Sequence, residues 1–185
     1  MIFLTIAVVL LALLCLANLL LIFAVFRRLR EHTAELSRLS RGAPQPFRDE
    51  LVGQSVPTFE ASAIDGTAVT GAGLVGRPGL VGFFSAGCEP CHDQAPKFAK
   101  WSSVGGGGAA TIAVVTGDGP QAEELVEAFR DRATVVAEPD ASVVASAFGI
   151  EAFPTFLRID AEGTITDTGV EVRDVVALAA ELTRH

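Results

Sequence analysis

The length, composition and charge of the chain exclude several classes of protein. Its 185 residues, 50% of them hydrophobic, leave room for one domain with a sizeable core. The formal net charge is −8, and residues 51–185 alone carry 8 Lys and Arg against 18 Asp and Glu, a net charge of −10. An acidic domain of this kind excludes nucleic acid as a partner, because phosphate binding needs a basic surface.

Residues 2–26 form an almost unbroken apolar run, interrupted by Thr5, Cys15 and Asn18. As an α-helix the run would extend about 37 Å at about 1.5 Å per residue, enough to cross a hydrocarbon core of about 30 Å. A cleaved signal peptide would need a basic start, a shorter run and small residues at a cleavage site, and none is present. We therefore expect residues 1–26 to be an uncleaved transmembrane helix in contact with membrane lipid.

Residues 27–50 are predicted to connect this anchor to a folded domain at residues 51–185. Residues 27–41 have the pattern of a short helix, which could lie on lipid head groups, pair with a second copy or form a solvated stalk. The glycine and two prolines of residues 42–46 then break the helix.

The pattern of residues 51–185 predicts strands that alternate with helices. Asp65 and Gly66 form an expected turn, Asp140 is expected to cap a helix, and Gly149 to end it. Strands are predicted at residues 59–63, 68–70, 80–84, 111–115, 134–136, 155–159 and 164–167, and helices at 88–103, 121–131, 140–148 and 172–182. This order is typical of an α/β fold with a sheet covered on both faces.

Two cysteines, Cys88 and Cys91, follow the buried strand predicted at residues 80–84 and open the next helix. A helix N-terminus carries about half an elementary positive charge, which favours a thiolate over a thiol. Cys88 should lie there with its sulfur accessible, and Cys91, one turn later, should face it. The pair is too close in sequence to cross-link a fold, so its predicted use is exchange between dithiol and disulfide.

The same residues, followed by His92, also fit a c-type haem attachment motif. Haem would need a second axial ligand, but the single methionine is Met1, and the other histidines are His32 and His185. Zinc would need a second pair of ligands. We expect neither a metal nor a cofactor.

Residues 149–156, Gly-Ile-Glu-Ala-Phe-Pro-Thr-Phe, resemble the cis-proline loop of thioredoxin-fold proteins, which faces their Cys-x-x-Cys helix. The resemblance implies a central mixed sheet flanked by helices, with a cis bond between Phe153 and Pro154 and with Thr155 starting a strand. A proline here has no N–H to donate. Neighbouring backbone groups could therefore bind an extended substrate chain beside Cys88. The residues expected to bind or support the substrate are Glu89, Pro90, Phe153, Pro154 and Thr155.

Within that fold, the chain resembles the TlpA-like disulfide reductases, close to the MauD group of methylamine-utilisation proteins. The shared features are the anchor, the opening at residues 53–59, the Asp65-Gly66 turn, Glu89 and Pro90 between the cysteines, and a hairpin at residues 159–163. The resemblance implies a membrane-anchored thiol–disulfide oxidoreductase that reduces or exchanges disulfides in partner proteins. A membrane protein or a thioredoxin-type donor would supply its electrons.

Several positions depart from the family pattern. Gly87 replaces the tryptophan usual before the first cysteine, Gly82 stands where classical thioredoxins have a buried acid, and Gln94 where TlpA-like reductases can have Glu. The family pattern therefore does not identify the base that deprotonates Cys91, and Glu89 and Asp93 are nearby candidates. Glu89 should also oppose the Cys88 thiolate and make the pair more reducing.

Two other functions remain as alternatives. A thiol peroxidase of the peroxiredoxin type would carry Pro-x-x-x-Thr-x-x-Cys, and here Ser85 stands at the threonine position but Val81 at that of the proline. A non-catalytic, tethered partner-binding module would function equally well after Cys88→Ser.

The side of the membrane is predicted differently by two arguments. Residues 27–41 contain five Arg and two Glu, and the positive-inside rule would place the domain in the cytoplasm. The resemblance places it outside, where a tethered reductase finds disulfides. We give the resemblance more weight and expect a single-pass membrane protein with an extracytoplasmic domain.

Overall fold

The computed structural model describes residues 2, 3, 5, 6, 10, 11, 14, 16, 50–104 and 109–176 of the chain. It divides into two units, Met1–Gln45 and Pro46–His185. The described residues of the first unit are helical, but no helix within the described residues has the length and hydropathy of a membrane span. Cys15, the helix predicted at 27–41, the breaking segment at 42–46 and residues 177–182 of the last predicted helix lie outside the described residues.

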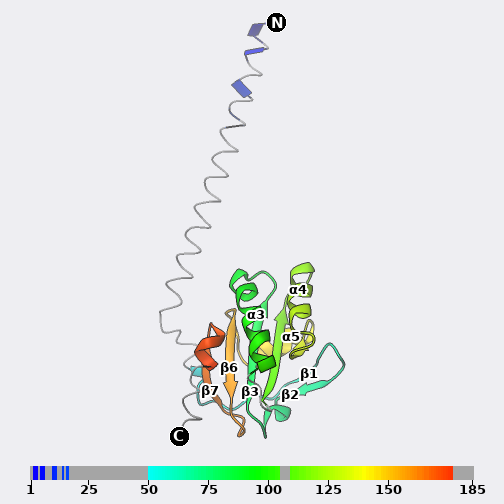
Figure 1. The fold of residues 1–185 in the computed structure, drawn as a ribbon. Coiled ribbons are helices and arrows are strands. Elements are labelled where there is room, and N and C mark those ends of the chain that lie inside the picture. Colours follow the sequence, from blue (N-terminus) through cyan, green and yellow to red (C-terminus); the bar gives the residue numbers. More distant parts are fainter. Residues whose placement is uncertain are drawn as a thin grey trace. The chain divides into compact units, whose positions relative to one another are not determined.

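A five-stranded mixed sheet forms the centre of the second unit, in the order β5-β4-β3-β6-β7 (Figure 1). Its strands are β3 (Gly79–Ser85), β4 (Ala110–Thr116), β5 (Thr134–Val136), β6 (Thr155–Ile159) and β7 (Ile165–Gly169). Strand β3 pairs in parallel with β4 and antiparallel with β6. A separate hairpin of β1 (Glu60–Ser62) and β2 (Ala68–Thr70) precedes a short 3-10 helix, η1 (Ala72–Leu74).

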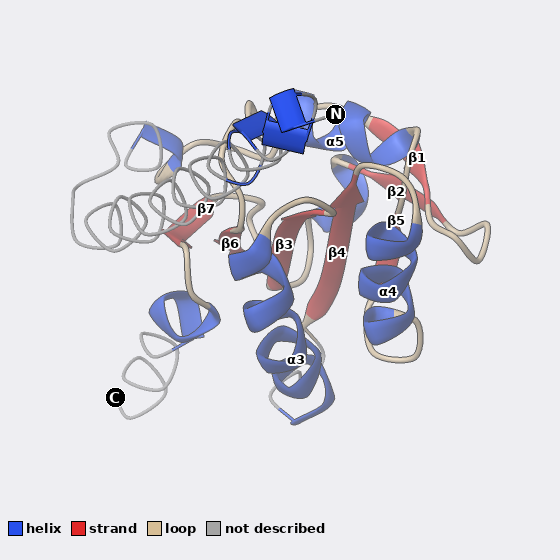
Figure 2. Ribbon diagram, turned by 90° about the horizontal axis from the view of Figure 1, so that it is seen from above, coloured by secondary structure: helices blue, strands red, loops and turns tan. Residues whose placement is uncertain are grey.

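Helices cover both faces of the sheet, which confirms the predicted α/β class. Figure 2 shows α3 (Glu89–Val104) and α4 (Pro120–Phe129) on one face, and α5 (Asp140–Ala147) on the other. Residues 172–176 form the described part of the last helix. They contribute Val172 and Val175 to the same core as α3 and α4.

Strand β3 separates two apolar cores, because successive side chains of a strand point to opposite faces. Val81 and Phe83 belong to the core under α5, whereas Leu80 and Phe84 belong to the core under α3 and α4. All four side chains are buried, at 0–1% exposure. Burial on both faces explains why β3 is a continuous apolar run in the sequence rather than an alternating one.

The start of α5 differs from the sequence-based expectation. Pro139 takes the N-cap position, and the Asp140 carboxylate instead accepts the backbone N–H of Ser62 in β1 at 2.8 Å. The prediction that Asp140 caps this helix is therefore wrong, because a partner distant in sequence occupies its side chain. Gly149 ends the helix as expected, with a φ of 65° that suits glycine.

Gly82 of β3 lies where a side chain would collide with aromatic rings. A Cβ atom there would come within 2.8 Å of ring carbons of both Phe84 and Phe98. Those two rings pack edge to face, with centroids 5.4 Å apart, so neither can move away independently.

We expect Gly82→Ala to lower the free energy of unfolding by about 1–3 kcal/mol, because overpacking displaces these rings. Gly87→Ala is the matched control, since a Cβ there meets nothing within 4 Å. It should leave stability unchanged or raise it by up to about 1 kcal/mol. Urea denaturation of both variants measures the difference, and equal effects would show that the two rings do not restrict Gly82.

Candidate active site

Cys88 lies between the end of β3 and the first turn of α3. Its N–H donates to the Ser85 carbonyl at 3.1 Å. The N–H of Cys91 donates to the Cys88 carbonyl at 2.9 Å and also points to the Cys88 sulfur, 3.2 Å away. The structure thus places Cys88 at the helix N-terminus, where backbone N–H groups favour the negative charge of a thiolate.

Cys88 and Cys91 form a disulfide, with their Cα atoms 5.2 Å apart. The two residues differ in exposure: Cys88 is half-buried, whereas Cys91 is 0% exposed. A partner protein can therefore reach Cys88 but not Cys91. This asymmetry suits Cys88 for attack on an outside disulfide and Cys91 for the internal step that releases the product.

The bond between Phe153 and Pro154 is cis, as the resemblance implied. Thr155, the first residue of β6, pairs with Phe83 near the end of β3. The bend at Phe153 and Pro154 therefore lies at the edge of the sheet where β3 leads into Cys88. Cys88 and Phe153 both pack against the core cluster that contains Cys91. The fold brings these sequence-predicted site residues together.

Thr155 supports this bend from inside the protein. Its side chain is 1% exposed, and its hydroxyl donates to the Ala152 carbonyl at 2.7 Å. A substrate therefore cannot reach the Thr155 side chain. Of the predicted binding residues, Glu89 is exposed, and Pro90 and Phe153 are half-buried.

A groove of about 470 Å³ adjoins the cis-proline loop. It is lined by Thr116, Ser142, Ala145, Ser146, Gly149, Ile150, Glu151 and Phe153. Next to it, the Glu138 carboxylate accepts the Ser142 hydroxyl at 2.7 Å and the Gly117 N–H at 3.1 Å. Glu138 thus ties the loop after β4 to α5, a role that no local sequence signal indicates.

The three departures from the family pattern have different structural settings. Gly87 is exposed, and the Gly82 position is closed by the rings of Phe84 and Phe98, which leave no room for a buried acid. Gln94 is buried, and its side-chain carbonyl accepts the Val172 N–H at 3.4 Å, joining α3 to the last helix. Asp93, like Glu89, is exposed.

His92 directs its Nε2 atom to the Ala86 carbonyl, 3.1 Å away. The ring is half-buried beside the disulfide turn. In a c-type haem site His92 would bind the iron, whereas here its Nε2 atom takes part in a backbone hydrogen bond. Within the described residues, no group of three His, Cys, Asp or Glu side chains is arranged to hold a metal ion.

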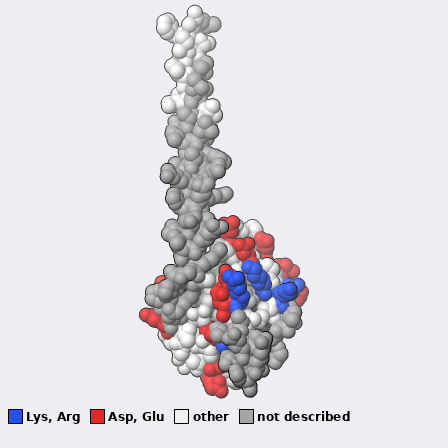
Figure 3. All heavy atoms as spheres, turned by 60° about the vertical axis from the view of Figure 1, so that its left-hand side comes forward, with Lys and Arg blue, Asp and Glu red and all other residues white. Residues whose placement is uncertain are grey.

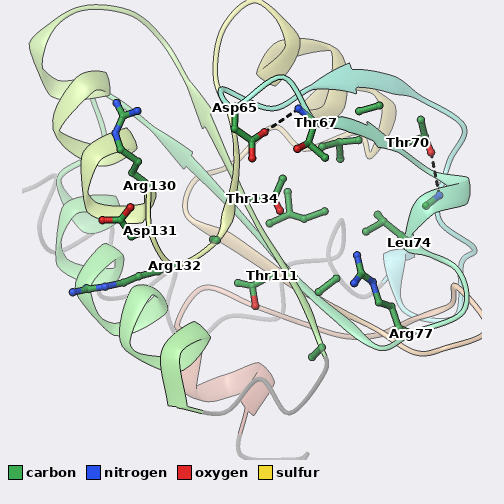
Figure 4. A pocket seen from close by; sticks show the side chains of 17 residues that line it. Asp65, Thr67, Thr70, Leu74, Arg77, Thr111, Arg130, Asp131, Arg132 and Thr134 are labelled. Atoms are coloured by element: carbon green, nitrogen blue, oxygen red, sulfur yellow. Dashed lines mark hydrogen bonds between the residues drawn. The ribbon is translucent and has the colours of Figure 1, made fainter.

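A further cavity of about 510 Å³ lies at the opposite edge of the sheet (Figure 4). Residues from the start of β4 line it, whereas Cys88 follows the end of the parallel strand β3. Asp65 on its rim accepts the Thr67 N–H at 2.9 Å, and hydrogen bonds from Thr67 hold the pKa of Asp65 below its ordinary value. This cavity is separate from the cysteine pair.

Comparison with known proteins supports the fold. The Redoxin family model matches residues 51–182. The thioredoxin-like protein YneN of Bacillus subtilis (strain 168) is 25% identical over 120 residues, which are 64% of this chain and 71% of YneN.

Solved structures with the same fold include the thioredoxin domain of thiol-disulfide oxidoreductase BVU-2223 from Bacteroides vulgatus. Its TM-score is 0.59 at 21% identity, over 71% of this chain and 96% of that one. A secreted Mycobacterium tuberculosis disulfide oxidoreductase homologous to E. coli DsbE has a TM-score of 0.55 at 20% identity, over 69% and 96%.

These likenesses confirm the thioredoxin-like fold that Cys88, Cys91 and the cis-proline segment predicted. The family model covers more than half of the chain and includes both cysteines and the bend at Phe153 and Pro154. The chain belongs to the Redoxin family.

Proposed function

We propose that the protein is a membrane-anchored thiol–disulfide oxidoreductase of the TlpA-like type, which reduces disulfides in partner proteins. The observation that carries this proposal is the unequal exposure of a disulfide pair at a helix N-terminus. Cys88 is within reach of a partner, and Cys91 is fully buried behind it. The similar proteins named as disulfide oxidoreductases have the same fold, which agrees with this chemistry.

The proposed reaction starts from the dithiol form. The Cys88 thiolate attacks one sulfur of a partner disulfide, that S–S bond breaks, and the other partner sulfur leaves as a thiolate and takes up a proton. Cys91 then loses its proton and attacks the Cys88 sulfur, which releases the second partner thiolate. Two electrons pass to the partner, and the pair is left as the disulfide seen here. A donor dithiol, from a membrane protein or a thioredoxin-type protein, reduces it again.

The loop at Phe153 and Pro154 supports a polypeptide as the substrate. It lies at the edge of the sheet where β3 leads to Cys88, and the groove lined by Ile150, Glu151 and Phe153 continues from it. A surface groove beside a reactive sulfur suits an extended chain better than a small molecule enclosed in a pocket.

The apolar run at residues 2–26 supports anchoring by a single span. We place the domain on the extracytoplasmic side, because protein disulfides form there. The surface of the domain supports a protein partner rather than nucleic acid. Acidic side chains are spread over the face seen in Figure 3, and the basic ones gather in one part of it.

Trapping a mixed disulfide tests the proposed roles of the two cysteines. In Cys91→Ser, attack by Cys88 still occurs but the partner cannot be released, so we expect partner proteins to accumulate in disulfide linkage to Cys88. Cys88→Ser should trap far less, because Cys91 is 0% exposed. Non-reducing electrophoresis and mass spectrometry of acid-quenched cells measure both variants. Equal trapping by the two would contradict the assignment, and the compartment of the trapped partner decides the side of the membrane.

The reduction potential tests the direction of electron flow. Equilibration of the full-length protein with glutathione should give a potential well below the value of about −120 mV found for strong oxidants. A potential near that value would reverse the proposed direction and make the protein a donor of disulfides.

Peroxide turnover tests the thiol-peroxidase alternative. We expect the purified protein to consume hydrogen peroxide no faster than its Cys88→Ser variant, because Val81, at the position of the peroxidase proline, is a buried residue of β3. Catalytic turnover that depends on Cys88 would instead favour a peroxidase.

A further inference from the structure

His92 occupies a position that neither the disulfide exchange nor the cis-proline loop explains. It follows Cys91 in the first turns of α3, and its half-buried ring reaches back to the turn that carries Cys88. There its Nε2 atom lies 3.1 Å from the carbonyl oxygen of Ala86, two residues before Cys88.

The chemistry of the Ala86 carbonyl determines the role of the Nε2 atom of His92. A carbonyl oxygen only accepts hydrogen bonds, so Nε2 of His92 must carry the proton in this contact. An imidazole in its other neutral tautomer would lose the bond. His92 therefore acts here as a hydrogen-bond donor.

The turn from Ser85 to Cys88 is attached to the rest of the domain at several points. The Ala86 N–H donates to the Thr116 carbonyl of β4 at 2.9 Å, and the Cys88 N–H donates to the Ser85 carbonyl. These attachments join backbone groups. The bond from His92 comes from a side chain and joins the turn to the helix that carries Cys91, so a substitution can remove it without altering the others.

The His92 bond matters differently in the two redox states. In the disulfide, a covalent bond already holds Cys88 to Cys91. In the dithiol, the peptide chain still joins the turn to α3, and the distance between the two sulfur atoms is set by the backbone and by non-covalent contacts, among them the bond from His92 to Ala86. Contacts that keep two thiols close raise their effective concentration and favour closure of the disulfide.

We propose that His92 is a positioning residue for the Cys88–Cys91 couple: by holding the Ala86 carbonyl, it keeps the two thiols together and makes the pair more reducing. This inference rests on the proposed thiol–disulfide exchange. It assigns to His92 the donation of a hydrogen bond, not a positive charge near the Cys88 thiolate. The two roles predict opposite effects, because losing a charge that stabilises the thiolate would make the pair more reducing.

Three forms of the full-length protein separate these roles: the wild type, His92→Phe and His92→Gln. His92→Phe keeps a ring but has no donor, whereas the side-chain nitrogen of His92→Gln stands the same number of bonds from Cα as Nε2 and can donate without being charged. Equilibration with glutathione measures the equilibrium constant between the dithiol and the disulfide for each form. Thermal unfolding of both variants shows that the fold is retained.

We expect His92→Phe to shift this constant toward the dithiol by about 2- to 10-fold, as the loss of one neutral hydrogen bond would. A tenfold shift corresponds to about 30 mV toward a more oxidising potential. His92→Gln should stay within about twofold of the wild type. An unchanged constant in His92→Phe, a shift toward the disulfide, or a His92→Gln variant that behaves like His92→Phe would overturn the proposal.

A measurement on the unsubstituted protein keeps the proposal testable if His92→Phe fails to fold. Nitrogen-15 NMR of the His92 ring should show Nε2 protonated in both redox states, and an Nε2 without a proton in the dithiol would overturn the proposal.

The glutathione experiment also separates the two proposals. If the wild type does not equilibrate with glutathione, the proposed function fails and this inference with it; if it does and His92→Phe matches it, this inference alone fails.

Discussion

Strand β3 leads into Cys88, and β6 begins directly after Pro154; the antiparallel pairing of these two strands is the constraint on which the site depends. Thr155 pairs with Phe83, so the end of one strand and the start of the other meet at one edge of the sheet. Residues more than 60 positions apart in the sequence thereby form one surface. The backbone hydrogen bonds of the sheet, rather than contacts between the site residues themselves, place them there.

Aromatic packing under α3 makes one cysteine inaccessible. The rings of Phe84, Phe98 and Phe156 contact one another in this core, and Cys91 is buried among the same cluster. A side chain at Gly82 would collide with the rings of Phe84 and Phe98. The site is therefore asymmetric: apolar packing surrounds one sulfur, and the helix N-terminus presents the other at the surface. In the proposed exchange, this asymmetry sets the order of the two steps, since only the outer sulfur can meet a partner.

Side-chain hydrogen bonds connect the loops around the disulfide to the elements behind them. Glu138 joins the loop after β4 to α5, Gln94 joins α3 to the last helix, and His92 joins the Cys88 turn to α3. Each bond reaches a backbone group that the sheet and helices leave without a regular partner. Residues that take no part in the proposed transfer of electrons thus connect the elements that carry and surround the cysteine pair.

The resemblance to thioredoxin-fold proteins implied the cis bond before Pro154. The sequence by itself determined the order of strands and helices along the chain and the position of Cys88 at a helix start. These features depend on local signals, namely apolar runs, glycine and proline positions and the spacing of two cysteines. Only the tertiary structure decided that Asp140 binds Ser62, 78 positions away, and that His92 binds Ala86. A side chain that can cap its own helix can also bind a distant backbone group, and packing alone decides which partner lies within hydrogen-bond distance.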